Sequence, residues 1–104
     1  MIIYNVTVKI EHDQHDDWLD WMKSKHIPDV MATGSFLSYR MSRVISMEDN
    51  DGTTYSIQYL CPDMKTLHQY QVHQAPALQK EHTERYEGKF VAFRTLLEMV
   101  DHSA

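Results

Sequence analysis

The chain has 104 residues, which suits a single domain with one hydrophobic core. Its content of 42% hydrophobic and 24% charged residues is ordinary for a globular protein and argues against wholesale disorder. Fifteen acidic against ten basic residues give a net charge of −5, so general binding to nucleic acid or to anionic membranes is not expected. We expect one domain over residues 1–100 and a frayed tail over 101–104.

The cellular location is predicted from what the sequence lacks. Cys61 is the only cysteine, so no internal disulfide can form. The first eleven residues do not resemble a signal peptide, and no apolar stretch approaches the roughly 20 residues that span a bilayer. These features predict a cytoplasmic protein without a membrane partner.

The first predicted elements are a strand and a helix. Residues 2–11 alternate between apolar and more polar side chains, which is typical of a strand with one apolar face. From Asp16 the apolar spacing becomes helical, with one line formed by Leu19, Met22, His26 and Val30. Because Pro28 disfavours helical geometry at the residue before it, we expect the helix to end or bend near His26. Gly34 then closes a short final turn.

The rest of the chain predicts a hairpin, a helix and a last strand. Residues 36–47 and 53–61 are rich in strand-forming residues, and the polar segment 48–52 between them is typical of a hairpin loop. A second helix is expected over 64–86, capped by Asp63 and bent or split at Pro76. Gly88 provides the turn into a strand over 89–100.

This order, β-α-β-β-α-β, predicts a ferredoxin-like α+β fold with a four-stranded antiparallel sheet and two helices on one face. The last strand is apolar on both sides, because Phe90, Ala92 and Leu96 alternate with Val91, Phe93 and Leu97. A sheet that is covered on one face should not expose such a surface to water. We therefore predict a two-fold homodimer through the uncovered sheet face.

Four segments, in this order and spacing, resemble a small bacterial family known only as a domain of unknown function: DDWLDWMKSKHIPDVMATGSF, TTYSIQY, ALQKEHTERY and KFVAFRTLLE. The resemblance covers essentially the whole chain, and this family is grouped with the dimeric α+β barrels. It implies the fold and the dimer, but no activity and no catalytic residue. The wider superfamily includes haem-degrading and antibiotic-biosynthesis monooxygenases, muconolactone isomerases and non-catalytic binding proteins, so the fold alone does not select a function.

The segment EHDQHDDW at residues 11–18 combines two histidines with four acids. His12 and His15, with Asp13 or Asp16, could ligate a metal, but their spacing fits no standard zinc pattern. A helix start explains the acids instead, with Asp13 as the N-cap and the following carboxylates in the first turn. We therefore predict no metal site.

His82 and Arg85 continue the apolar line of the second helix, so both should point toward the sheet or its rim. Antiparallel helices place them beside the start of the first helix. They could form an anion-binding or acid/base site. The favoured alternative is that Arg85 pairs with Asp16 or Asp17 and ties the two helix ends together.

The same topology places His26 at the opposite end of the sheet, with Cys61 and Asp63, so a site shared with His82 is not expected. A lone histidine on an apolar line is usually a hydrogen-bonded core residue, which is the interpretation that we favour. The alternatives are a proton-transfer residue, an axial haem ligand in a pocket between helices and sheet, or a nucleophilic pair with Cys61.

Tyr55 and Tyr59 share one face of the third strand, where they either line such a pocket or pack at the dimer interface. The favoured function is binding of a small apolar or aromatic ligand, contacted by His26, Tyr55 and Tyr59, with no cofactor predicted apart from the haem alternative. The second hypothesis is a small monooxygenase-like or isomerase-like enzyme, with His26, His82 and Arg85 as the catalytic candidates.

Overall fold

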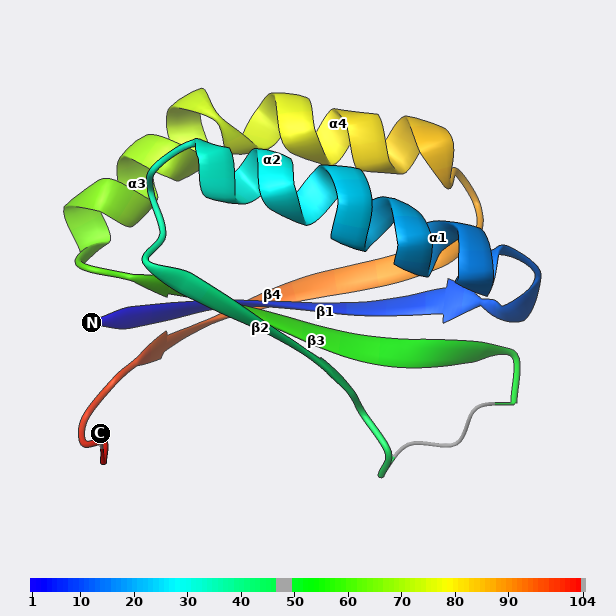
Figure 1. Cartoon of the computed structure of the whole chain (residues 1–104), viewed down its shortest axis with the longest axis horizontal. Helices are drawn as coiled ribbons and strands as arrows, with labels where there is room; N and C mark the ends of the chain where they lie inside the picture. Colours follow the sequence, from blue (N-terminus) through cyan, green and yellow to red (C-terminus); the bar gives the residue numbers. More distant parts are fainter. Residues whose placement is uncertain (47–49, 104) are drawn as a thin grey trace.

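The computed structural model describes residues 1–46 and 50–103. Within them the elements follow the order β1 (Ile2–Glu11), α1 (His15–Trp21), α2 (Ile27–Ala32), β2 (Ser38–Arg43), β3 (Gly52–Cys61), α3 (Met64–His73), α4 (Ala75–Arg85) and β4 (Phe90–Glu98). The strands form an antiparallel sheet in the order β2-β3-β1-β4, and the helices cover one of its faces (Figure 1). The predicted ferredoxin-like α+β fold is confirmed.

The hydrophobic core lies between the helices and the inner face of the sheet. Strand β1 alternates as expected, and its inward side chains Tyr4, Val8 and Ile10 are buried. It pairs with β3 on one side and β4 on the other, so it occupies the centre of the sheet. The helices contribute Trp18 and Leu67, both fully buried. The core is therefore a single hydrophobic layer between the helices and one face of the sheet.

The first helical segment departs from a regular α-helix just before Pro28, as expected, and continues to Ala32. It does not end at His26, because a π-helical turn, Met22–His26, joins α1 directly to α2. In this turn the Ile27 N–H bonds to the Met22 carbonyl, five residues earlier. The wider turn accommodates proline, which lacks an N–H and clashes with the carbonyl four residues before it in a regular α-helix. His26 therefore lies within a continuous helical segment.

The second helical segment follows the prediction more closely. It is split as expected, since α3 ends at His73 and α4 begins at Ala75. Pro76 occupies the first turn of α4, where its missing N–H has no helical partner to lose. Asp63 caps α3 by accepting a hydrogen bond from the Thr66 backbone N–H at 2.8 Å. The predicted cap and split are both confirmed.

Two local expectations were wrong. Asp13 does not cap the first helix, because a 3₁₀ turn (His12–Gln14) joins β1 to α1 and the Asp13 carboxylate accepts from Lys89 Nζ at 2.9 Å. Strand β2 begins at Ser38 and not at residue 36 as predicted. Phe36 lies before the strand, where it is buried in the core and stacks on Tyr4. The hairpin loop predicted at 48–52 lies partly outside the described residues.

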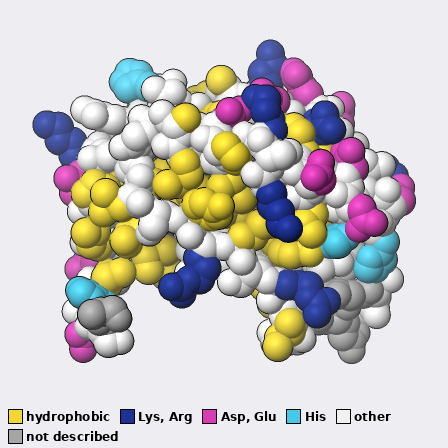
Figure 2. All heavy atoms as spheres, viewed as in Figure 1, with side chains coloured by type: hydrophobic (Ala, Val, Ile, Leu, Met, Phe, Trp, Pro, Cys, Tyr) yellow, Lys and Arg dark blue, Asp and Glu magenta, His cyan; other side chains and the backbone are white. Residues whose placement is uncertain are grey.

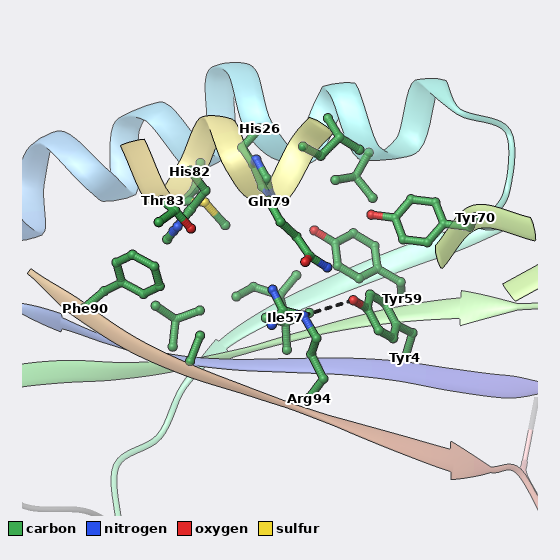
Figure 3. A pocket seen from close by; sticks show the side chains of 16 residues that line it. Tyr4, His26, Ile57, Tyr59, Tyr70, Gln79, His82, Thr83, Phe90 and Arg94 are labelled. Atoms are coloured by element: carbon green, nitrogen blue, oxygen red, sulfur yellow. Dashed lines mark hydrogen bonds between the residues drawn. The ribbon is translucent and has the colours of Figure 1, made fainter. Parts of the chain in front are cut away.

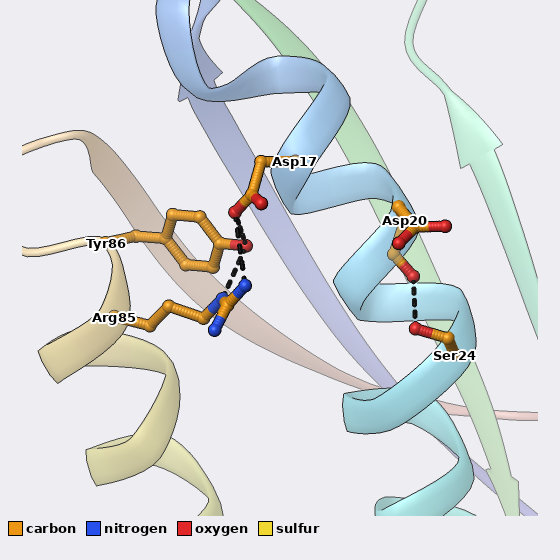
Figure 4. Close-up of polar contacts among 5 residues, drawn as sticks. All are labelled: Asp17, Asp20, Ser24, Arg85 and Tyr86. Carbon is orange, nitrogen blue, oxygen red and sulfur yellow. Dashed lines mark hydrogen bonds and ion pairs between the residues drawn. The ribbon is translucent and has the colours of Figure 1, made fainter.

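A polar contact joins the start of α1 to the end of α4 (Figure 4). The buried Tyr86 hydroxyl donates to Asp17 Oδ2 at 2.8 Å, and Arg85 Nη2 lies 3.4 Å from the same oxygen. Arg85 Nε also donates to the Tyr86 hydroxyl oxygen at 3.1 Å. The predicted tie between the helix ends is therefore present, with Asp17 as the acid. Tyr86, which the sequence did not single out, makes the shorter contact to it.

We expect Tyr86→Phe to lower the free energy of unfolding by about 1–3 kcal/mol, because the lost hydroxyl donates to a charged acceptor. The control is Tyr39→Phe, the same change at a side chain that is 51% exposed on β2, with an expected effect within about 0.5 kcal/mol. Urea unfolding followed by circular dichroism measures both. Equal effects of the two substitutions would show that the tie does not stabilise the fold.

Candidate functional site

A cavity of about 170 Å³ lies between the helices and the sheet (Figure 3). Strands β1, β3 and β4 form its floor, and the first helical segment together with α3 and α4 forms its roof. Much of its wall is apolar and includes Val6, Val8, Ile57, Leu78, Phe90 and Ala92. Polar side chains interrupt this wall, including Gln79, Thr83, Arg94 and two groups of rings. We call the two groups of rings the histidine pair, His26 and His82, and the tyrosine cluster, Tyr4, Tyr59 and Tyr70.

The histidine pair corrects an expectation. Both imidazoles line the same cavity, with ring centroids 5.7 Å apart, so the predicted placement at opposite ends of the sheet is wrong. The physical reason is the π-helical turn before Pro28. Because the helix continues through His26 instead of ending there, this residue lies over the middle of the sheet and opposite the antiparallel helix α4.

The proton of His82 is placed by a buried hydrogen bond. Trp18 Nε1 donates to His82 Nε2 at 2.9 Å. An accepting ring nitrogen carries no proton, so neutral His82 holds its proton on Nδ1. Burial, with smaller contributions from His26 and Arg94, lowers the pKa of His82 to about 4. At neutral pH this side chain is therefore an uncharged ring whose remaining polar group is a hydrogen-bond donor.

Ring contacts hold His26 in place. Its ring stacks on Trp21 with centroids 5.1 Å apart, and its buried Nδ1 has no hydrogen-bond partner among the described residues. Burial lowers the pKa of this imidazole, although the carboxylates of Glu81 and Asp29 oppose the shift. The favoured interpretation of a hydrogen-bonded core histidine is therefore not what the structure shows. The Nδ1 atom of His26 is therefore available to hydrogen-bond a ligand or to accept a proton.

The Cys61 thiol contacts backbone carbonyls and not the His26 ring, so the alternative of a nucleophilic pair is not supported. Its thiol is directed to the backbone carbonyls of Ser35 and Asp63, at 3.5 and 3.4 Å. Burial raises the pKa of this thiol, which disfavours the reactive thiolate.

Tyr59 lines the cavity, but Tyr55 and Arg85 do not. The Tyr55 hydroxyl lies 2.7 Å from His15 Nε2, and the Arg85 guanidinium lies over the Trp21 ring at 5.4 Å. Tyr55 borders a separate surface groove between the first helical segment and β2, where hydrophobic side chains gather (Figure 2). Both tyrosines face the helices rather than the outer side of the sheet.

One member of the tyrosine cluster, Tyr4, contacts the cation Arg94. Arg94 Nε donates to the Tyr4 hydroxyl at 3.1 Å, while the hydroxyls of Tyr59 and Tyr70 have no hydrogen-bond partner among the described residues. Burial raises the pKa of both Tyr59 and Tyr70, so they remain protonated donors. The carboxamide of Gln79 points into the same space from α4 (Figure 3). No aspartate or glutamate belongs to the described lining of this cavity.

Sequence reasoning missed Arg94, Tyr4, Tyr70 and Gln79. A signal was available for Arg94, because it is the charged residue on the side of β4 that otherwise carries Phe90, Ala92 and Leu96. An isolated charge on an inward-facing apolar line requires a polar partner or water. Tyr4 was assigned only to the inner face of β1, and nothing local distinguishes it from a packing residue.

The described residues offer no grouped set of metal ligands, and the cavity between them is small for a haem. Within 1–46 and 50–103, no three His, Cys, Asp or Glu side chains are grouped so that they could hold a metal ion, and His15 contacts Tyr55 and Asp16 instead. The cavity volume of about 170 Å³ is below the roughly 300–1,000 Å³ of pockets that hold drug-sized ligands, and haem is at least as large as such a ligand.

None of the described helices is both long and apolar enough to cross a membrane.

The model of one protein family matches residues 1–100. The chain belongs to this family, which is described as a domain of unknown function (DUF4286). No curated protein matches the chain. The family assignment agrees with the resemblance seen in the sequence and brings no activity with it.

Solved structures with the same fold show very low sequence identity. HapK from Hahella chejuensis has a TM-score of 0.73 at 9% identity, over 100% of this chain and 97% of that one. A dimeric ferredoxin-like protein from an uncultured marine organism has a TM-score of 0.70 at 11% identity, and the match covers 100% of this chain and 99% of that one. A mutant of SnoaB, a cofactor-independent oxygenase from Streptomyces nogalater, has a TM-score of 0.67 at 10% identity, and the match covers 97% of this chain and 95% of that one. These similarities establish the fold alone.

We expect the free energy of unfolding to decrease as the pH falls from about 6.5 to about 4. In this window the unfolded chain binds a proton at His82 with the ordinary pKa of 6.5, whereas the folded chain resists it until about pH 4. Protons therefore favour the unfolded state, by up to about 3 kcal/mol. Urea unfolding at a series of pH values measures the slope.

His82→Gln should reduce the slope of this part of the pH profile and leave the part that comes from the lowered pKa of His26. His73→Gln, at the exposed end of α3, should leave the slope unchanged. A wild-type slope that persists in His82→Gln would show that the burial of His82 is not its source.

Proposed function

We propose that this protein binds a small, mainly apolar molecule with a single ring in the cavity between the helices and the sheet. The cavity itself supports this proposal, because protein interiors are normally close-packed and about 170 Å³ is left open here. A buried apolar cavity of about 150 Å³ is large enough to hold benzene. Apolar walls with a few converging polar groups are also characteristic of small-molecule sites.

We expect a single-ring compound to bind saturably, and Ala92→Leu to weaken the binding at least about tenfold by filling the cavity from β4. Ala77→Leu is the matched control, since Ala77 is exposed on α4 and outside the cavity lining. NMR titration with benzoate and with benzamide, observed at the Trp21 indole and at the histidine pair, measures the affinity. The proposal is wrong if neither compound causes a saturable change at these groups.

We further propose that the protein is a cytoplasmic homodimer, joined through the sheet face that the helices leave open. On β4 the outward side chains Val91, Phe93 and Leu97 are 66%, 62% and 40% exposed. A contiguous apolar surface of this kind usually marks a protein interface, and a second copy offers a surface of the same character. The lone, buried thiol of Cys61 is compatible with a reducing compartment.

Val91→Glu should convert the dimer to a monomer, because it places a charge in the buried interface. Val72→Glu is the matched control, since Val72 is 52% exposed on α3 and lies away from the sheet. Light scattering at micromolar concentration distinguishes a mass near 12.3 kDa from twice that value. A monomeric wild-type protein would contradict the proposal.

The unpartnered nitrogen of His26 favours a second candidate function, an isomerase-like enzyme acting on the bound compound. In it, His26 accepts a proton from a carbon of the ligand, and the Nδ1–H of His82 stabilises the oxyanion that develops on an adjacent carbonyl. Return of the proton to another carbon completes the isomerisation without a redox step. Exchange of a ligand C–H for deuterium, lost in His26→Gln while binding persists, is the expected signature.

A further inference from the structure

We propose that the ligand of the cavity carries a carboxylate on its single ring, and that Arg94 and the tyrosine cluster hold this carboxylate. The inference rests on the proposed ligand-binding function and adds the chemical class of the ligand. It depends on charge, on hydrogen-bond donors without acceptors and on the size of the cavity.

The first argument is charge. The chain has a net charge of −5, yet the described lining of its cavity contains the guanidinium of Arg94 and no carboxylate. Arg94 is an exposed residue of the edge strand β4 and uses Nε to contact Tyr4, so the N–H groups of its two terminal nitrogens face the mouth of the cavity and solvent, where a ligand can reach them. A guanidinium edge presents two parallel N–H groups, the geometry that a carboxylate accepts.

The second argument is the excess of donors. Since the Tyr4 oxygen accepts from Arg94, its own O–H proton is available to another acceptor. The hydroxyls of Tyr59 and Tyr70 are likewise unpartnered among the described residues, and in Figure 3 they point toward the Gln79 carboxamide. Several donors and one cation surround a space that has few acceptors. An oxygen anion would satisfy them together.

The third argument selects a carboxylate. One guanidinium balances the single charge of a carboxylate, whereas a phosphate dianion would leave one of its charges without a counter-charge in the described lining. The histidine pair does not attract the anion, because His82 is uncharged at neutral pH. The apolar wall near Phe90, whose ring meets His82 edge-on at 4.4 Å, is left for the ring of the ligand.

Benzoate and benzamide test this inference because they have nearly the same shape and differ in charge. We expect benzoate to bind the wild-type protein at least about tenfold more tightly than benzamide, because a charge-assisted hydrogen bond contributes more than a neutral one. Arg94→Gln should abolish this preference, and Arg94→Lys should retain part of it. Arg40→Gln is the matched control, an exposed arginine on β2 that lies outside this cavity.

A second measurement needs no variant. Burial is the main cause that lowers the pKa of both His26 and His82, and Arg94 adds to it. Both ligands bury the imidazoles alike, but only a carboxylate offsets the charge of Arg94, so NMR titration should show higher pKa values for both imidazoles with saturating benzoate than with saturating benzamide. Benzamide binding as tightly as benzoate would overturn the carboxylate assignment and leave the proposed function intact. A benzoate preference that survives Arg94→Gln, or that is lost in Arg40→Gln, would also overturn it, whereas failure of both compounds to bind would reject the ligand-binding function itself.

Discussion

The buried hydrogen bond from Trp18 to His82 sets the spacing of the two helical segments above the sheet. The indole belongs to α1 and the imidazole to α4, so the contact holds these antiparallel helices at a fixed separation. It gives both Trp18 Nε1 and His82 Nε2 a hydrogen-bond partner in an apolar layer, where an unpartnered polar atom is costly. The tie of Tyr86 to Asp17 repeats the connection at the rim. The cavity lies in the space that these contacts hold open.

The electrostatics of the cavity follow from the same arrangement. Burial keeps the two imidazoles neutral and the phenols protonated, so the charge in the site comes from Arg94 at the edge strand β4. An acidic protein thereby carries a cation and no carboxylate in the described lining of this cavity. An apolar, uncharged region near Phe90 is separated from a donor-rich region near Tyr4, and this separation would orient the proposed ligand.

The sequence predicted the elements well because their signals are local. Strand alternation, the Asp63 cap and the break at Pro76 each depend on a few neighbouring residues, and the structure confirms them. The placement of His26 failed because a proline is compatible with either a helix end or a π-helical turn. Only packing of the whole segment against α4 and the sheet selects the turn, and that packing brings His26 to His82.

By itself the sequence determined the ferredoxin-like order of elements, the apolar outer face of β4 and the polar contact between the helix ends, since periodicity and antiparallel topology suffice for each. The tertiary structure alone decided that the histidine pair shares a cavity, that Tyr55 lies outside it, and that Arg94 lines it together with the tyrosine cluster and donates to Tyr4. These residues are far apart in the chain. Their convergence depends on strand register and on how completely the helices fill the inner face, which no local pattern encodes.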